Sequence, residues 1–199
     1  MKYERTEFYI KVLEDTVIEN FTNLIAYNIC IGSKCKILKG TKIFRNVVIN
    51  NEVTIGTNCI IGNSVLIRNN VKLGNDVSIG FSNSLEPFCE IGGNTRTQGF
   101  CMISEFSKIG KNCFLGPHFN SMGDDTIGKP IRAYKPNPPI IEDDCRFGSG
   151  TKVCPGIIIK KGTVTGAMSL LTKDTEENSL YYGVPARLIR KLSEDLYIS

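Results

Sequence analysis

Aliphatic residues recur at every sixth position along most of this chain. One run keeps a single phase from Ile31 to Leu115, broken only by the polar Thr97, and a second run in a shifted phase extends from Ile141 to Leu171. A period of six fits neither the 3.6-residue repeat of a helix nor the two-residue repeat of an amphipathic strand, and it is typical of stacked short repeats. The pattern predicts an all-β fold, a parallel β-helix with three six-residue units per coil and about seven coils.

The other positions of the repeat indicate which side chains face inward. The fourth residue after each aliphatic is mostly small or β-branched, which suits a flat wall packed from inside. Glycine often follows the aliphatic directly, and we expect it to let the chain turn a corner tightly there. Six of the eight cysteines occupy the inward small position, no two of them 18 residues apart, and are predicted to be reduced core residues: Cys35, Cys59, Cys89, Cys101, Cys113 and Cys145.

Length and charge narrow the class of protein. With 199 residues and a net charge of +4, the chain is predicted to be one domain, and its charge is too small to favour nucleic-acid binding. No apolar run is long enough to span a membrane and the N-terminus lacks a signal-peptide core, so we expect a cytoplasmic protein. A single histidine and the absence of any Cys-x-x-Cys pair predict no metal site.

The repeat also divides the chain into segments. Residues 1–24 are only loosely periodic and are predicted to form an N-terminal cap, whereas 25–120 and 141–176 form the β-helix. Between them, residues 121–140 contain four of the eight prolines and no six-residue unit. An insertion of this length without its own secondary structure is usually functional, so we interpret it as an active-site loop. Residues 177–199 are predicted to form a C-terminal strand and helix.

The predicted helix depends on a proline and the apolar residues after it. Pro185 suits the first position of a helix, and Leu188, Ile189 and Leu192 follow at helical spacing.

Three segments near the C-terminus resemble the hexapeptide-repeat acyltransferases. They are Phe147–Thr151, Gly166–Asp174 and the ending Gly-Val-Pro-Ala-Arg-Leu-Ile-Arg-Lys at residues 183–191. The resemblance implies a left-handed β-helix, a homotrimer, and acyl-coenzyme A held in the groove between neighbouring prisms.

A narrower resemblance concerns the acceptor. Residues 23–32, residues 114–119 and the pair Gly123-Asp124 are similar to the N-acyltransferases of nucleotide-linked amino sugars. These enzymes acylate the amine of a dTDP- or UDP-bound deoxysugar made for surface polysaccharide, which implies acetyl-CoA as co-substrate and a nucleotide-linked amino sugar as partner. The family commonly has Asn-Asp where this chain has Gly123-Asp124, so a role of that asparagine side chain does not carry over.

Acyl transfer from a thioester to an amine needs a proton acceptor and a donor to the thioester oxyanion. Backbone N–H groups at the corners of the prism supply the donor, and the candidates are Gly148 and Ala167. The phosphates of coenzyme A are anionic, and basic residues at the chain's end are candidates for binding them: Arg187, Arg190 and Lys191.

His118 is the only histidine and the first candidate for the general base, with Asp124 as its rival. Both have simpler interpretations, an exposed or packing histidine and a turn residue. Five further residues are candidates for binding the ammonium group, sugar hydroxyls, base and diphosphate of the substrate. They are Asn120, Asp125, Arg132, Tyr134 and Lys135. A further possibility is that no residue acts as base and the amine, deprotonated in water, attacks directly.

Two other functions fit the same fold. One is an O-acetyltransferase of another small acceptor, and the other is a hexapeptide scaffold without activity. A zinc enzyme of the carbonic-anhydrase type needs three histidine ligands, and one histidine per chain does not supply them.

Overall fold

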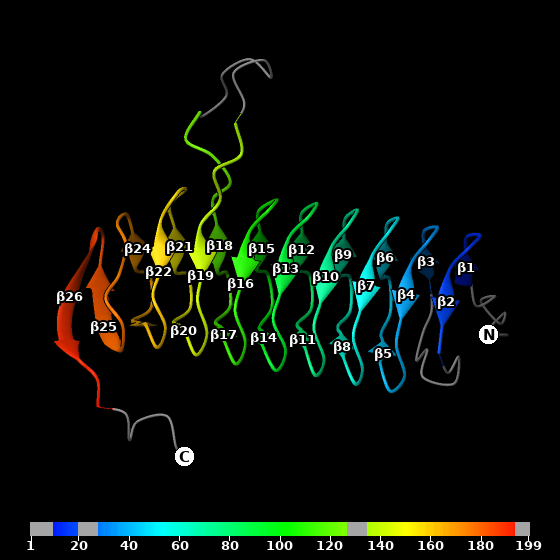
Figure 1. Ribbon diagram of the computed structural model, residues 1–199, viewed down its shortest axis with the longest axis horizontal. Helices are drawn as coiled ribbons and strands as arrows, with labels where there is room; N and C mark the ends of the chain where they lie inside the picture. Colours follow the sequence, from blue (N-terminus) through cyan, green and yellow to red (C-terminus); the bar gives the residue numbers. More distant parts are fainter. Residues whose placement is uncertain (1–9, 20–27, 127–134, 194–199) are drawn as a thin grey trace, which may run out of the picture.

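The computed structural model describes residues 10–19, 28–126 and 135–193, and within these residues β-strands are the only regular secondary structure. It winds into a long prism with β1 at one end and β26 at the other (Figure 1). Each coil adds one short strand to each of three sheets, which we call sheets A, B and C in the order in which the chain visits them. The turns between them are the A–B, B–C and C–A corners. All pairings are parallel except that of β25 with β26.

The strands of each sheet follow one another along the prism. Sheet A contains β1 (Ile10–Val12), β3 (Ile29–Ile31), β6 (Val48–Ile49), β9 (Leu66–Ile67), β12 (Ser84–Leu85), β15 (Met102–Ile103), β18 (Asn120–Ser121), β21 (Lys152–Val153) and β24 (Leu170–Leu171). Sheet B contains β2 (Val17–Ile18), β4 (Lys36–Ile37), β7 (Thr54–Ile55), β10 (Lys72–Leu73), β13 (Glu90–Ile91), β16 (Lys108–Ile109), β19 (Ile140–Ile141) and β22 (Ile158–Ile159). Sheet C contains β5 (Lys42–Ile43), β8 (Ile60–Ile61), β11 (Ser78–Ile79), β14 (Arg96–Thr97), β17 (Phe114–Leu115), β20 (Arg146–Phe147), β23 (Val164–Thr165), β25 (Ser179–Gly183) and β26 (Ala186–Lys191).

The predicted fold class is confirmed, but the solenoid has about nine coils rather than about seven. Of the additional strands, β1 and β2 lie at the N-terminal end, β25 and β26 lie at the C-terminal end, and β18 lies inside the prism just before the loop. At the N-terminal end β1 pairs with β3, and at the C-terminal end β25 pairs with β23. A terminal strand is held by backbone hydrogen bonds to one neighbour and does not need an inward aliphatic in the six-residue phase, so counting repeats misses it.

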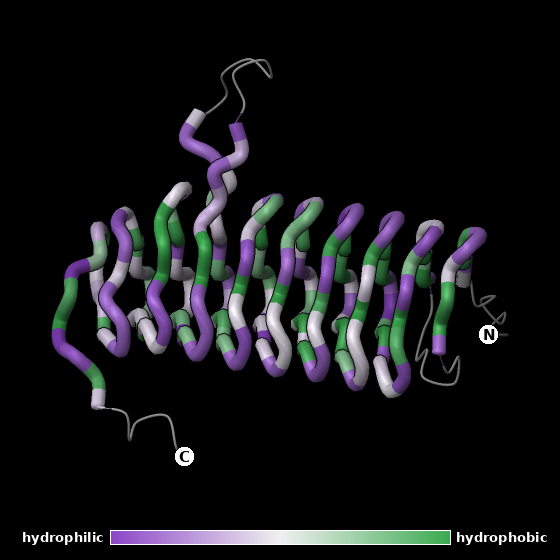
Figure 2. Tube along the Cα trace, in the orientation of Figure 1, coloured by the Kyte–Doolittle hydropathy of each residue, from purple (hydrophilic) through white to green (hydrophobic). Residues whose placement is uncertain are grey.

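The six-residue period arises because each two-residue strand points one side chain inward. The second residue of each repeating strand is buried while the first faces outward, as in Lys36–Ile37 and Ser78–Ile79. Hydrophobic and hydrophilic residues therefore alternate around every coil (Figure 2). The polar Thr97 keeps the register because its hydroxyl accepts a hydrogen bond from Asn83 Nδ2 at 2.6 Å.

The glycine directly after the inward aliphatic is not the residue that turns the corner, contrary to the expectation from the sequence. The residue with positive φ is the third after the inward aliphatic, and most often it is not glycine: examples are Asn58 (φ 56°) and Asn94 (φ 58°). Asparagine and aspartate are the non-glycine residues that tolerate this conformation best. The glycine directly after the aliphatic has a different role, since a Cβ on Gly92 would lie 2.6 Å from the carbonyl carbon of Gly110 on the next coil. It is needed for the close approach of successive coils.

The six predicted core cysteines are buried, and all eight thiols are free. Although no two of them are 18 residues apart in the sequence, Cys113 and Cys145 lie on adjacent coils. The loop between them lengthens the spacing of stacked residues from 18 to 32, as in the pairing of Phe114 with Arg146. A hydrogen bond with the Cys113 thiol, together with burial, raises the pKa of the Cys145 thiol.

The loop leaves the prism one strand later than predicted. Asn120 and Ser121 form β18 in sheet A, where Ser121 is fully buried and pairs with Val153. Its hydroxyl lies 3.1 Å from that of Ser104 and 3.2 Å from that of Ser107, so the polar side chain is satisfied inside the core. The chain then projects from the A–B corner and returns as β19 in sheet B (Figure 1).

The predicted C-terminal helix is wrong. Residues 179–191 form a hairpin of β25 and β26, with Gly183 (φ 105°) at the turn. The edge of sheet C beyond β23 presents unpaired backbone N–H and C=O groups, and β25 forms parallel hydrogen bonds with them. Leu188 and Ile189, whose spacing fitted a helix, are 42% and 53% exposed on β26. Apolar spacing alone does not distinguish a short helix from an edge strand.

Candidate functional site

His118 lies at the C–A corner, between β17 and β18, with φ at 60°. Its imidazole is exposed and stacks on the ring of Phe100, with centroids 5.1 Å apart and ring planes 7° apart. Phe81 in turn packs edge-on against Phe100 at 5.0 Å. This aromatic column of Phe81, Phe100 and His118 holds the imidazole in one position, whereas a lone surface histidine normally lacks such packing.

The two predicted oxyanion donors lie at the same corner as His118. Gly148 and Ala167 are on successive coils, and a Cβ on Gly148 would lie 2.5 Å from the Ala167 nitrogen. The Gly148 N–H donates to the Thr165 carbonyl at 3.1 Å. Among the described residues, no hydrogen bond uses the Ala167 N–H. Ala167 is therefore the better candidate of the two, because its donor is still available.

Asp124 lies at the other edge of sheet A, at the base of the loop. Its Oδ1 accepts hydrogen bonds from the Thr126 hydroxyl and, at 2.6 Å, from the Thr126 N–H. These bonds hold the pKa of the Asp124 carboxyl below its usual value and make it a weaker base. Within one chain β18 separates Asp124 from His118, so the two candidate bases do not act on one atom together.

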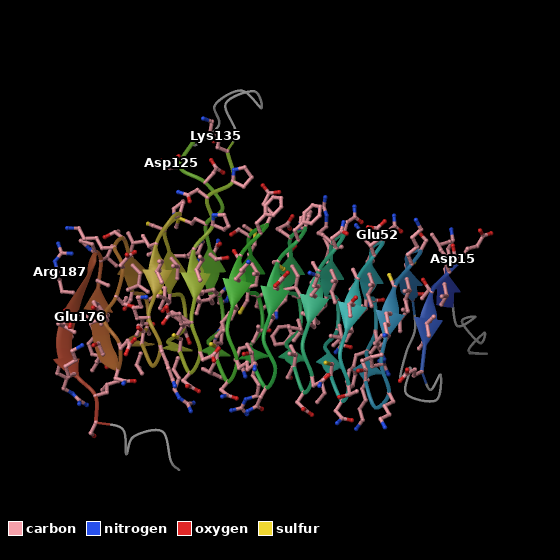
Figure 3. All side chains as sticks on the ribbon, in the orientation of Figure 1. Asp15, Glu52, Asp125, Lys135, Glu176 and Arg187 are labelled. Carbon is pink, nitrogen blue, oxygen red and sulfur yellow. The ribbon has the colours of Figure 1, made fainter. Side chains whose placement is uncertain are left out.

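The other substrate-binding candidates are spread over the loop and its base. Asp125 and Lys135 are exposed on the projecting part, away from the prism (Figure 3). Asn120 faces outward on β18, and its Oδ1 is a buried atom that has no hydrogen-bond partner among the described residues. Arg132 and Tyr134 lie outside the described residues.

A cleft at the base of the loop contains two acidic residues that the sequence analysis missed, Glu86 and Glu105. Burial, and then the nearby charges of Glu86 and Asp124, raise the pKa of the Glu105 carboxyl. Asn120 lines the same cleft. The signal in the sequence was a spacing of 19 residues from Glu86 to Glu105 and again from Glu105 to Asp124, one residue more than the 18 of a coil.

The C-terminal cations differ in availability. Lys191 pairs with Glu176 at 2.8 Å and also donates to the Glu177 carbonyl at 3.0 Å. Arg187 and Arg190 are exposed on β26, and within the described part of the chain their side chains bond only to carbonyls of their own strand. Figure 3 shows Arg187 at the end of the prism. The two arginines remain candidates for phosphate binding, and Lys191 is occupied.

Within the described ranges, no three His, Cys, Asp or Glu side chains gather in a way that would hold a metal ion. The same residues include no helix long and apolar enough to cross a membrane.

Two family models match parts of the chain. The model of the bacterial transferase hexapeptide (six repeats) matches residues 34–69, and that of the hexapeptide repeat of succinyl-transferase matches residues 138–172.

Three known proteins illustrate the similarity. The bifunctional protein GlmU of Thermosipho africanus is 32% identical over 124 residues, which cover 54% of this chain and 27% of that protein. The 2,3,4,5-tetrahydropyridine-2,6-dicarboxylate N-succinyltransferase of a Wolbachia strain is 34% identical over 98 residues, covering 47% of this chain and 34% of that enzyme. The chain thus spans about a third or less of these two relatives. The crystal structure of UDP-N-acetylglucosamine O-acyltransferase (LpxA) from Moraxella catarrhalis superimposes with a TM-score of 0.67 at 14% identity, covering 94% of this chain and 74% of that one. At this identity the likeness concerns the fold.

Proposed function

Since this chain belongs to the superfamily of hexapeptide-repeat acyltransferases, which fold as left-handed β-helices, we propose that it is an N-acetyltransferase. In this proposal an acetyl group moves from acetyl-CoA to the amine of a dTDP- or UDP-linked amino deoxysugar, in the cytoplasm, for surface polysaccharide. The curated relatives include an N-succinyltransferase, whose name describes acyl transfer to nitrogen.

One observation carries the proposal: His118 and the available Ala167 N–H share the C–A corner. The amine nitrogen attacks the thioester carbonyl and forms the C–N bond. His118 takes the proton that the nitrogen loses, and the Ala167 N–H donates to the oxyanion of the tetrahedral intermediate. When the tetrahedral intermediate collapses, the C–S bond breaks, and the thiolate of coenzyme A leaves and takes up a proton. Arg187 and Arg190 are the candidates for binding the phosphates of coenzyme A.

The acidic cleft at the base of the loop favours an amine over a hydroxyl acceptor. Glu86, Glu105 and Asp124 give it a negative charge that attracts an ammonium group more strongly than a neutral alcohol.

A panel assay tests the proposal directly. With acetyl-CoA and a set of dTDP- and UDP-linked amino sugars, we expect thiol release that depends on at least one acceptor. The matched control is the same nucleotide sugar with a hydroxyl in place of the amine, which should give no release. Activity on hydroxyl acceptors alone would instead identify an O-acetyltransferase, and a protein that does not bind coenzyme A in calorimetry would be a scaffold.

We also propose that the active protein is a homotrimer, because His118 and the acidic cleft lie on opposite edges of sheet A in one chain. A neighbouring protomer that packs there brings its own loop to the His118 corner. The outward row of sheet A carries no charge from β3 to β18, and it exposes Val48 (39%) and Met102 (45%). Sheet B has charged residues in the same row, such as Lys72 and Glu90.

Light scattering checks the trimer. We expect the mass of three chains at micromolar concentration, and Met102→Glu should lower it because a charge is then buried between protomers. The control is Ile60→Glu, a residue of similar exposure (42%) on sheet C, which should leave the mass unchanged. A monomeric wild-type protein would contradict the proposal.

A further inference from the structure

The outward row of sheet C carries two arginines with an aromatic ring between them. Arg96 begins β14, Phe114 begins β17 and Arg146 begins β20, and the strand register places the three side by side. Because adjacent strands lie about 4.8 Å apart, the two arginine strands are about 10 Å apart with the phenyl group midway. We infer that these residues, which we call the Arg–Phe–Arg strip, bind a phosphorylated nucleoside.

The two guanidinium groups have no counter-ion within the part of the chain that the structure describes. None of the five ion pairs found there includes Arg96 or Arg146, and no side-chain hydrogen bond uses either. Lys72, in the outward row of sheet B, is by contrast paired with Glu90 at 3.0 Å. The strip is therefore a local excess of positive charge with planar donors directed outward.

A cleft at the B–C corner is lined by the strip and its neighbours Asn112 and Asp144. Asp144 does not neutralise the arginines, because its Oδ1 accepts from Asn112 Nδ2 at 3.1 Å and its Oδ2 lies 3.6 Å from Lys161 Nζ. The amide of Asn112 in turn accepts from Asn94 Nδ2 at 3.0 Å. These hydrogen bonds form a fixed polar rim beside the two free guanidinium groups.

The chemistry of the strip selects its ligand. A guanidinium group binds phosphate through two parallel hydrogen bonds. A half-buried phenyl ring offers a face on which a nucleobase stacks, whichever base it is. A bare anion would use only the arginines and an apolar ligand only the ring, whereas a base joined to phosphates uses all three residues.

The position of the strip relates it to the proposed reaction. Phe114 precedes His118 by four residues on the same coil, and sheet C leads directly into the C–A corner. A nucleotide that extends from the strip across sheet C would therefore reach the corner where acyl transfer is proposed. This step rests on the proposed function, in which both substrates contain a phosphorylated nucleoside: the acceptor nucleotide sugar and coenzyme A.

Calorimetry without turnover tests the inference separately from the activity. The probes are dTDP, UDP and coenzyme A, with inorganic diphosphate for comparison. We expect Arg96→Gln and Arg146→Gln each to weaken nucleotide binding by about ten- to a hundred-fold. Phe114→Leu should weaken nucleotide binding but leave diphosphate binding unchanged. The control is Lys42→Gln, an outward cation of the same sheet row far from the strip, which should have no effect.

The outcomes separate two sources of the ligand. Loss confined to dTDP or UDP assigns the strip to the acceptor, and loss confined to coenzyme A assigns it to the donor; both support the inference. Nucleotide binding that is absent, or equal in the wild type and the three strip variants, overturns it. Nucleotide binding that depends on the strip in a protein without acetyl transfer would leave the inference standing and reject the proposed function. Equal melting temperatures of the variants show that the fold is intact, since all three side chains face outward.

Discussion

Removing the imidazole of His118 is expected to lower kcat by about 10²- to 10⁴-fold, with little change in KM for acetyl-CoA. The reason is that the attacking amine must lose a proton as the C–N bond forms, and His118 is the histidine that the aromatic column holds at the proposed corner. Steady-state kinetics of His118→Ala against the wild type measures the effect. His118→Asn should give the same loss, and it is the cleaner variant because asparagine tolerates the positive φ of this position.

Asp124→Asn is the comparison that locates the proton acceptor. Because hydrogen bonds from Thr126 already lower the pKa of this carboxyl, we expect a smaller loss than at His118. A larger loss in Asp124→Asn would move the acceptor into the loop. A loss below about tenfold in both His118 variants would mean that alignment alone drives catalysis, and the rate should then follow the ionisation of the substrate amine.

The repeat predicts the middle of the fold well because the repeat and the fold have the same physical cause. Each strand points one side chain into a narrow core, so most inward positions are aliphatic, as Ile37, Ile55 and Leu73 are. At the ends that cause disappears. β1 and β26 are held by backbone pairing to a single neighbour, and their sequences carry no inward phase to detect. Ser121 shows the same limit inside the prism, since hydroxyl partners from other coils replace the aliphatic.

The candidate site was harder to predict because its neighbours are set by the stacking of coils. His118, Gly148 and Ala167 were chosen separately, and only the register across the loop shows that they share one corner. The acidic cleft was missed although Glu86 and Glu105 are nearly one coil apart in the sequence. Asp124 was recognised, but its bonds to Thr126 favour the simpler interpretation as a turn residue.

Gly92→Ala is expected to destabilise the protein by about 1–3 kcal/mol, because the added methyl group overpacks the contact between two coils. A Cβ there would lie 2.6 Å from the carbonyl carbon of Gly110 and 2.7 Å from the nitrogen of Lys111. These are backbone atoms that cannot move aside, since the Gly110 N–H is bonded to the Ile141 carbonyl at 2.8 Å. For a chain of this size the melting temperature should fall by several degrees, measured by calorimetry at a fixed scan rate.

The neighbouring glycine provides the matched control for this prediction. In Gly93→Ala the new methyl group would have one close atom, the Asn75 carbonyl oxygen at 3.1 Å, and the next at 3.8 Å. Neither Gly92 nor Gly93 has a positive φ, so backbone strain does not distinguish the two variants. If Gly92→Ala and Gly93→Ala lowered the melting temperature equally, the glycine after each aliphatic would be needed for the tight corner, as the sequence analysis expects. A large fall in Gly92→Ala alone means that glycine is required where one coil rests on the next, and that the spacing of the coils depends on it.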